Sequence, residues 1–422
     1  MAEVIPFRGV FYNPAQVPGS TVTAPPYDII TPEFKETLYN RSPYNIVHID
    51  SGKNLLADNE NENRYTRARD ALNKWLKEGI LIRDAEPFFY CYEATYTSEG
   101  IQKQLRGFIG AVRLEELEGG NIHPHEKTHS KPKTDRLNLM RFCMANISPI
   151  FALYSSHERH ASSILDQATK DNAFIESIDE DGFIHRLWAI KDKNCIDEIK
   201  KELTDKAIFI ADGHHRYETA LDFRNEMQGK GFLKTGLEPF NYVMMFLANI
   251  EDNGLNILPT HRLVTNMPEN VEGLLKPFFD ITAFPFNSSG EESVGAEFFK
   301  SMHRRGHSLG MYLRGENVYY VLNFKGSYSH IDAPQALRTL DVVILHNLIL
   351  EDLFKIAAVD YEMNFELAVK KVKQGDYGAV FLLNPTGIKD VKAVALAGER
   401  MPPKSTYFYP KLLTGMVINK FD

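Results

Sequence analysis

The sequence has few cysteines: only Cys91, Cys143 and Cys195 occur among its 422 residues, and they lie far apart. Three widely spaced cysteines exclude both the disulfide framework of a small secreted domain and a zinc site built from four thiolates. The opening residues, MAEVIPFRGV, also lack the basic start and the apolar stretch of a secretory signal. We therefore expect a cytoplasmic protein.

Long apolar runs and an excess of positive charge are missing as well. The longest apolar runs, YVMMFLAN (242–249) and VVILHNLIL (342–350), fall short of the roughly 20 residues that cross a bilayer. The formal net charge is −8 at pH 7, with a sequence pI near 6.0. A negative chain opposes general nucleic-acid affinity, which depends on Lys and Arg neutralising phosphates. We expect neither a membrane span nor nucleic-acid binding.

What the sequence does contain is typical of a folded globular enzyme, with 43% hydrophobic and 25% charged residues. A length of 422 residues exceeds what one core usually fills, at roughly 100–200 residues per domain. The residue pattern changes after Leu263. We expect a first domain over 1–265, a second mixed α/β module over 266–395, and a C-terminal segment over 396–422 that packs back on the site.

Helical and strand patterns both occur, which predicts an α+β fold. Apolar residues at helical spacing predict an amphipathic helix over 61–79. Aromatic and β-branched residues favour an antiparallel pair of strands over 87–97 and 104–114. The pattern also predicts a helix at about 135–145 with a strand at 149–154, a strand that enters a helix within 207–227, and a long buried helix over 334–354.

The stretch HPHEKTHSKPKTDR (123–136) contains H-E-K-T-H, a literal match to the H-E-x-x-H pattern of zinc proteases. That chemistry requires both histidines on one face of a regular helix. Pro132 would end such a helix within about two turns, and the residues after His129 offer no apolar face. We expect no zinc, and a zinc hydrolase is kept only as a third hypothesis.

The same stretch also reads as a polar loop, either solvated or lining a charged site. It places Glu126 among several cations, a mixture that suits phosphate and metal together. His125 and Glu126 are candidate catalytic residues. Arg136 is a candidate phosphate ligand.

The clearest local signal is ADGHHR (211–216), where a buried strand enters a helix. Backbone N–H groups, the positive end of the helix dipole and a guanidinium meet there, a combination that binds anions. Gly213 lets the chain turn, and Asp212 can hold a metal or cap the helix. His214, His215 and Arg216 are candidate phosphate ligands; a plain capping role for Asp212 is the alternative.

Three shorter motifs contribute further candidates. MPPKST (401–406) forms a rigid turn that carries a lysine and two hydroxyls but lacks the glycines of a P-loop. LPTHR (258–262) ends a strand, where site residues often gather. The candidates are Lys404, Ser405 and Thr406 for phosphate, and Asp28 of PPYD with His261 and Arg262 for substrate; each also has a purely structural explanation.

These motifs together resemble a known bacterial and archaeal family, domain of unknown function 1015. The resemblance covers essentially the whole chain. It rests on PPYD (25–28), PHEKT with DR (124–128, 135–136), NISPIF (146–151), ADGHHRYETAL (211–221), PTHR (259–262) and MPPKSTYFYPKLLTG (401–415). In that family the loop reads H-E-x-T, which makes His129 incidental.

The D-G-H-H-R turn is also similar to the phosphate-binding turn of the ParB and sulfiredoxin superfamily, which includes kinases of free L-serine. This resemblance implies a ParB/sulfiredoxin-like core in which Asp212 to Arg216 hold donor phosphates beside Mg²⁺, with Asp212 as a candidate catalytic residue and metal ligand. In those kinases an acidic residue takes the proton of the acceptor hydroxyl, and Glu126 is the candidate for this base. We expect a Mg²⁺-dependent phosphotransferase that acts on a small hydroxylated metabolite such as serine, with a nucleotide or pyrophosphate donor. A homodimer is compatible with this expectation. A nucleotide-binding regulator without turnover is the alternative.

Overall fold

The computed structural model describes residues 2–98, 100–117, 119–126, 128, 130–287, 289–304 and 306–421. Helices and mixed sheets alternate along the chain, which confirms the predicted α+β class. Within the described ranges, no helix combines the length and the apolar character that a membrane crossing requires.

The chain divides into two compact units. The first unit comprises Met1–Pro124, Thr128–Leu255 and Pro410–Asp422; the second comprises His125–Lys127 and Asn256–Tyr409. This division differs from the contiguous segments 1–265, 266–395 and 396–422 that the sequence pattern suggested. The physical reason is strand pairing between distant segments, which composition along the chain does not reveal.

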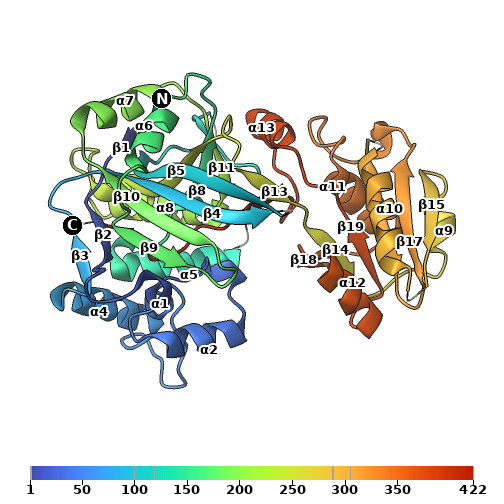
Figure 1. Cartoon of the computed structure of the whole chain (residues 1–422), viewed down its shortest axis with the longest axis horizontal. Coiled ribbons are helices and arrows are strands. Elements are labelled where there is room, and N and C mark those ends of the chain that lie inside the picture. The colour runs from blue at the N-terminus through green and yellow to red at the C-terminus, as the bar shows by residue number, and fades with distance from the viewer. Residues whose placement is uncertain are drawn as a thin grey trace. The chain divides into compact units, whose positions relative to one another are not determined.

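The first unit is built on a mixed sheet (Figure 1), in which the described strands follow the order β6-β11-β8-β12-β5-β4-β10-β9, with β1 paired to β5. The β11–β6 and β12–β8 pairs are parallel and the other pairs are antiparallel. The strands are β1 (Val4–Ile5), β4 (Phe89–Ser98), β5 (Ile101–Arg113), β6 (Ile122–His123), β8 (Ile150–Tyr154), β9 (Ile175–Ile178), β10 (Ile184–Ile190), β11 (Ile208–Asp212) and β12 (Tyr242–Asn249).

A smaller antiparallel sheet of the same unit has the order β3-β2-β21-β7, so that the C-terminal strand lies between two early ones. Its strands are β2 (Gly9–Tyr12), β3 (Leu81–Arg83), β7 (Ala145–Asn146) and β21 (Ile418–Lys420). The helices of this unit are α1 (Gly19–Val22), α2 (Pro32–Arg41), α3 (Val47–Asp50), α4 (Arg64–Lys77), α5 (Ser130–Cys143), α6 (His160–Ala168), α7 (Lys193–Leu203) and α8 (His214–Gly229), with short 3-10 turns η1 (Tyr27–Ile29) and η2 (Pro239–Asn241).

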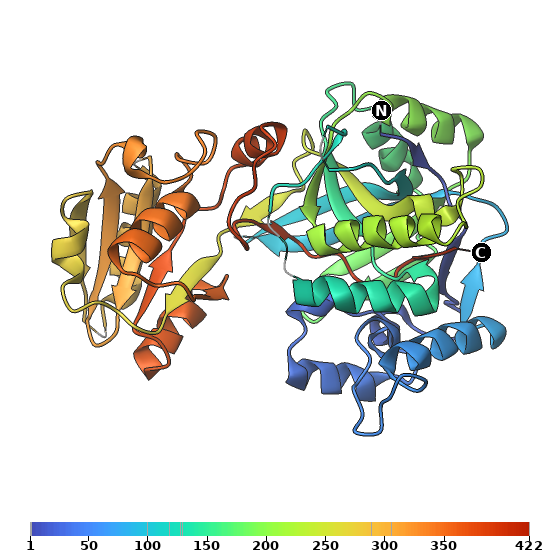
Figure 2. The same ribbon diagram turned by 180° about the vertical axis from the view of Figure 1, so that it is seen from behind.

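Helices α5 and α8 lie side by side in the first unit (Figure 2). Helix α8 packs on β8 and β12, and Tyr217 and Phe223 on it join the same buried cluster as Ile150 and Val243 of those strands. Apolar burial of this kind supplies most of the stability of an amphipathic element. The packing fixes the position of the turn between β11 and α8.

The second unit contains an antiparallel sheet with the order β15-β17-β16-β19-β14-β18. Helices α10 and α12 pack on it, with Phe298 and Val369 in its buried cluster. The elements of this unit are β13 (Asn256–Leu258), β14 (His261–Val264), β15 (Phe279–Pro285), β16 (Ser308–Leu313), β17 (Val318–Phe324), β18 (Asp360–Glu362), β19 (Ala379–Leu382), β20 (Tyr407–Tyr409), α9 (Val271–Leu275), α10 (Glu291–Arg304), η3 (Tyr328–His330), α11 (Asp341–Val343), the π-helix η4 (Ile344–Leu353), α12 (Phe365–Gln374) and α13 (Ile388–Leu396).

Most of the predicted elements are confirmed, and two start at other residues than expected. Helix α5 begins at Ser130, earlier than expected. Pro132 is tolerated because it lies in the first turn, where the N–H group that proline lacks would have no helical partner. Glu126 lies in a β-bridge to Met401 and not in a helix, so the expectation that Pro132 would end an H-E-x-x-H helix is not tested. The long helix predicted from residue 334 begins only at Asp341, after a turn around Leu337, and continues as the π-helix η4.

Helix α4 begins with a capping box that is open to a direct test. The Asn63 side chain accepts hydrogen bonds from the N–H groups of Tyr65 and Thr66, and Thr66 Oγ1 accepts one from Asn63 N–H. We expect Asn63→Ala to lower the free energy of unfolding of the first unit by about 1 kcal/mol. Urea titration followed by tryptophan fluorescence measures this unit, because both tryptophans, Trp75 and Trp188, belong to it.

Asn73→Ala is the matched control, since Asn73 is an exposed residue in the interior of the same helix. There the change removes no cap and improves helix propensity, so the urea concentration at the midpoint of unfolding should not fall. Equal midpoints for the two variants would contradict the role of the capping box.

Candidate functional site

The turn between β11 and α8 has the backbone geometry that the ADGHHR motif predicts. Gly213 is the N-cap residue of α8 with φ 93° and ψ 29°, in the left-handed region that favours glycine. A Cβ at this position would lie 2.8 Å from Arg216 Nε. Glycine therefore serves both the turn and the close approach of the Arg216 guanidinium.

Asp212, the last residue of β11, lies between two cations. Arg216 Nη2 donates to Asp212 Oδ2 at 2.9 Å, and Lys411 Nζ lies 3.2 Å from Asp212 Oδ1. The Asp212 side chain keeps 24% of its area exposed, so this corner is reached by solvent. The positive end of the α8 dipole adds to the two cations.

Arg216 also joins this corner to the residues just before β8. Its Nη1 donates to Ser148 Oγ at 3.3 Å and to the carbonyl of Pro149. Arg216 further lines a small cavity of about 30 Å³ together with Asp50 and Arg136. Two of the arginines that the sequence selected thus lie at one place in the first unit.

Arg136 is buried and already bound by carboxylates. It donates to Asp50 Oδ1 at 2.8 Å and to Asp135 Oδ2 at 2.5 Å, and its guanidinium lies 4.0 Å from the centroid of the Tyr27 ring. The negative charges of these carboxylates outweigh burial and raise the pKa of Arg136. Burial raises the pKa of Asp50, and the nearby Arg136 opposes this shift. The contacts make Arg136 a structural part of the wall behind Arg216.

The other candidates of the first unit are His214, His215 and Asp28. His214 is buried, and His215 is half-buried in the first turn of α8. Asp28 lies in η1 beside Tyr27 and is exposed. Burial, with a smaller contribution from Asp28, raises the pKa of Tyr27 to about 12, while the arginines Arg136 and Arg216 oppose the shift.

The remaining candidates lie in the second unit, around the MPPKST turn. His125 and Glu126 are not helical: Glu126 forms a parallel bridge to Met401, and Met401 N–H donates to the His125 carbonyl at 2.8 Å. Glu126 Oε1 accepts a hydrogen bond from Lys404 N–H, where Lys404 has φ 57°. The carboxylate thus stabilises a left-handed backbone that lysine rarely adopts. His129 lies outside the described residues.

The hydroxyl groups of the same turn have partners inside the second unit. His125 Nε2 and Thr406 Oγ1 are 2.9 Å apart. Ser405 Oγ donates to the Pro402 carbonyl at 2.6 Å. Both hydroxyl residues are buried, so their described contacts stabilise the turn.

Arg262 is fully buried beneath this turn. It donates to His346 Nε2 at 3.1 Å and to the Lys404 carbonyl at 3.0 Å, and it lies 5.3 Å from the centroid of the Tyr361 ring. His261 Nδ1 accepts a hydrogen bond from Leu383 N–H at 3.3 Å. Burial, reinforced by the charge of Arg262, lowers the pKa of His261 to about 4 and that of His346 to about 3.

The candidate residues therefore form two groups, one in each unit. Asp28, Arg136 and the Asp212–Arg216 turn belong to the first unit, and the other candidates to the second. Sequence reasoning missed Asp50, Ser148 and Lys411 as parts of the first group. Two of the three had a signal, because Ser148 lies in the NISPIF motif and Lys411 in MPPKSTYFYPKLLTG. No motif marks Asp50.

The carboxylates of the first group show whether the side chains there could hold the predicted Mg²⁺. Among the described residues, no group of three or more His, Cys, Asp or Glu side chains is arranged to hold a metal ion. Mg²⁺ commonly binds one or two carboxylates and completes its shell with water and substrate phosphates. Asp212 fits this role as a single protein ligand, provided that the phosphates come with the substrate.

The family model for "Protein of unknown function (DUF1015)" matches residues 4–343. The chain belongs to the DUF1015 family. A comparison with curated protein sequences finds no match. The family assignment confirms the resemblance drawn from the motifs, and it supplies no reaction.

Solved structures with a similar arrangement are distant. A free serine kinase in complex with AMP is 13% identical, with a TM-score of 0.34, and the match covers 70% of this chain and 89% of the kinase. A conserved hypothetical protein from Pyrococcus furiosus is 13% identical, with a TM-score of 0.34 and coverage of 72% and 98%. SbnI from Staphylococcus aureus, with a C-terminal truncation, is 10% identical, with a TM-score of 0.37 and coverage of 72% and 85%. At these scores the likeness carries no functional argument.

The low pKa values of His261 and His346 predict an acid-sensitive second unit. Both side chains accept hydrogen bonds in the fold and are neutral there, whereas the unfolded chain takes up protons below pH 6.5. Stability should fall as the pH drops from about 6.5 to about 4, with His261 alone contributing about 3 kcal/mol of loss. Hydrogen exchange of β14 and β19 amides, corrected for intrinsic rates, measures this slope.

In the double variant His261→Asn and His346→Gln, amide oxygens replace the accepting ring nitrogens and do not titrate, so the slope should flatten. His303→Asn, on an exposed turn of α10, is the control and should keep the native slope. A double variant as acid-sensitive as the native protein would refute the assignment.

The buried Arg136 gives a second test. We expect Arg136→Met to lower the free energy of unfolding of the first unit by about 3 kcal/mol, because Asp50 would stay buried without its partner. Arg141→Met on the same helix is the control: Arg141 is exposed and its partner Glu226 partly exposed, and the cost should stay within about 1 kcal/mol. Tryptophan fluorescence in urea compares the two, and equal losses would show that Arg136 has no special structural role.

Proposed function

We propose that this protein is a phosphotransferase whose phosphoryl donor binds at the β11–α8 corner of the first unit. The observation that supports the proposal is the set of groups around Asp212: a left-handed glycine, the N-terminal end of a 16-residue helix, and the cations Arg216 and Lys411. Phosphate oxygens bind most strongly to such a combination of charge-assisted donors and helix amides.

Arg216 and Lys411 have defined tasks in this proposal. Each donates to one Asp212 oxygen, and each can turn its charge to a phosphate instead, because the Asp212 carboxylate is partly exposed. Asp212 would then be a ligand of Mg²⁺, which supplies charge neutralisation for the donor phosphates when it is bound. Phosphoryl transfer depends chiefly on this positioning and neutralisation.

The acceptor in this proposal is a small hydroxylated metabolite such as serine. The donor's phosphorus–oxygen bond breaks, a bond forms to the acceptor oxygen, and the hydroxyl proton passes to a base. Glu126 is the predicted base and stays a prediction, since its Oε1 accepts a hydrogen bond from Lys404 N–H within the second unit. The resemblance of the D-G-H-H-R turn to that of free-serine kinases suggests this acceptor.

Binding and turnover are tested separately. Calorimetry should detect ATP, ADP or pyrophosphate in the presence of Mg²⁺, and Arg216→Met and Lys411→Met should each weaken the affinity at least about tenfold through loss of a charge-assisted contact. Lys230→Met, at the far end of α8, is the control and should bind as the native protein does. If no phosphorylated compound binds the folded native protein, the corner is not a donor site.

Turnover is followed by ³¹P NMR with L-serine and the same donors, and phosphoserine is the expected product. Glu126→Gln should abolish turnover without loss of donor binding if Glu126 is the base. Donor binding without any product from a panel of hydroxylated metabolites would favour the nucleotide-binding regulator instead.

A further inference from the structure

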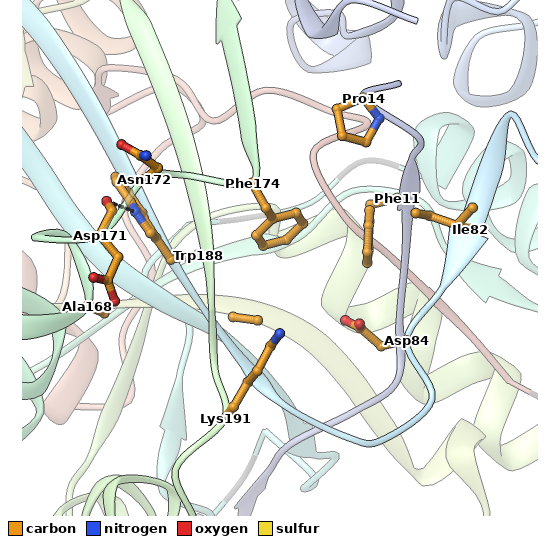
Figure 3. A pocket seen from close by; sticks show the side chains of 11 residues that line it. Phe11, Pro14, Ile82, Asp84, Ala168, Asp171, Asn172, Phe174, Trp188 and Lys191 are labelled. Atoms are coloured by element: carbon orange, nitrogen blue, oxygen red, sulfur yellow. Dashed lines mark hydrogen bonds between the residues drawn. The ribbon is translucent and has the colours of Figure 1, made fainter. Parts of the chain in front are cut away.

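A second cavity of the first unit lies where the smaller sheet meets the end of β10 (Figure 3). Its volume is about 480 Å³, within the usual range of small-molecule sites. Residues of β2, β3 and β10 and of the loop before β9 line it. None of the residues around Asp212 takes part, so this pocket is independent of the proposed donor site.

The walls of the pocket are aromatic. Phe11 and Phe174 pack edge to face, with ring centroids 4.8 Å apart. Trp188 is largely buried, and its Nε1–H donates to the Asp171 carbonyl at 2.9 Å, which fixes the indole. Two ordered rings and a fixed indole provide a preformed apolar surface for a flat or bulky side chain.

At one side of these rings, Asp84 is held by several bonds. The Tyr90 hydroxyl donates to Asp84 Oδ2 at 2.6 Å, and the Asp84 N–H donates to the Gly9 carbonyl at 3.0 Å. A Cβ on Gly9 would lie 2.5 Å from the Tyr90 hydroxyl oxygen, so glycine is required for this approach. Among the described residues, Asp84 Oδ1 accepts no hydrogen bond, and it is available to a ligand.

Lys191 supplies the opposite charge. In Figure 3 its ammonium and the Asp84 carboxylate both point into the pocket, below the Phe174 ring. Lys191 forms no ion pair within the described part of the chain, and its Nζ lies 5.9 Å from the centroid of the Phe88 ring. Asp171 also lines the pocket, beside Trp188. Asp84 and Lys191 thus offer opposite charges to the same space, next to an aromatic wall.

We propose that this pocket binds a free α-amino acid with an aromatic or large aliphatic side chain. The ammonium of the ligand would bind Asp84, its carboxylate would bind Lys191, and its side chain would pack on Phe11, Phe174 and Trp188. A ligand with only one of the two charges leaves either Asp84 or Lys191 unmatched. A phosphate group would be repelled by Asp84 and attracted by only one lysine, so the pocket does not suit a nucleotide.

The test uses the full-length protein and four compounds that differ by one feature. L-Phenylalanine carries both charges and the ring; phenethylamine lacks the carboxylate, 3-phenylpropionate lacks the ammonium, and glycine lacks the side chain. Calorimetry and Trp188 fluorescence should show binding of L-phenylalanine at least tenfold tighter than that of the other three. Comparable binding of phenethylamine or 3-phenylpropionate would overturn the assignment, as would the absence of binding by phenylalanine, tryptophan, leucine and methionine.

Two variants locate the binding. Asp84→Asn still accepts the Tyr90 hydrogen bond, and Lys191→Met changes an exposed residue, so both should fold. Each should weaken L-phenylalanine binding at least tenfold, whereas Lys193→Met, at the nearby start of α7, should not. Native affinity in both pocket variants would overturn the proposal.

Discussion

The turn from β11 into α8 is the constraint on which the first group of candidate residues depends. A buried strand ends at Asp212, one glycine turns the chain through a left-handed conformation, and a helix begins at once. Because α8 is held by packing on β8 and β12, the direction of its N-terminus is set by the core. The Arg216 guanidinium then returns over the glycine to Asp212, and any side chain at position 213 would obstruct it.

Charge is used differently in the two groups of candidates. Around Asp212 the cations are partly exposed and could exchange one anionic partner for another. Around Arg262 the cation is buried, bonded to carbonyls and a neutral histidine, and committed to the MPPKST turn. The first arrangement resembles a ligand site. The second resembles a support that keeps an unfavourable backbone in place.

The local part of this structure could be read from the sequence, and the distant part could not. Periodicity and glycine placement predict the 207–227 strand–turn–helix, the 87–114 hairpin and helix α4 because each depends on neighbouring residues. The partners of the candidate side chains come from far along the chain: Lys411 meets Asp212, Asp50 meets Arg136, and Glu126 meets Lys404. No local pattern encodes such pairs, so chemistry-bearing motifs were found while their grouping into two units was not.

The position of β21 has a consequence for synthesis of the protein. This strand, made of Ile418–Lys420, lies between β2 and β7, whose residues are translated hundreds of positions earlier. Ribosomes add roughly 5–20 residues per second, so β2 must wait many seconds for its neighbour to emerge. The smaller sheet can close only after residues 418–420 have left the ribosome. Until then its open strand edges would be exposed to chaperones and to other nascent chains.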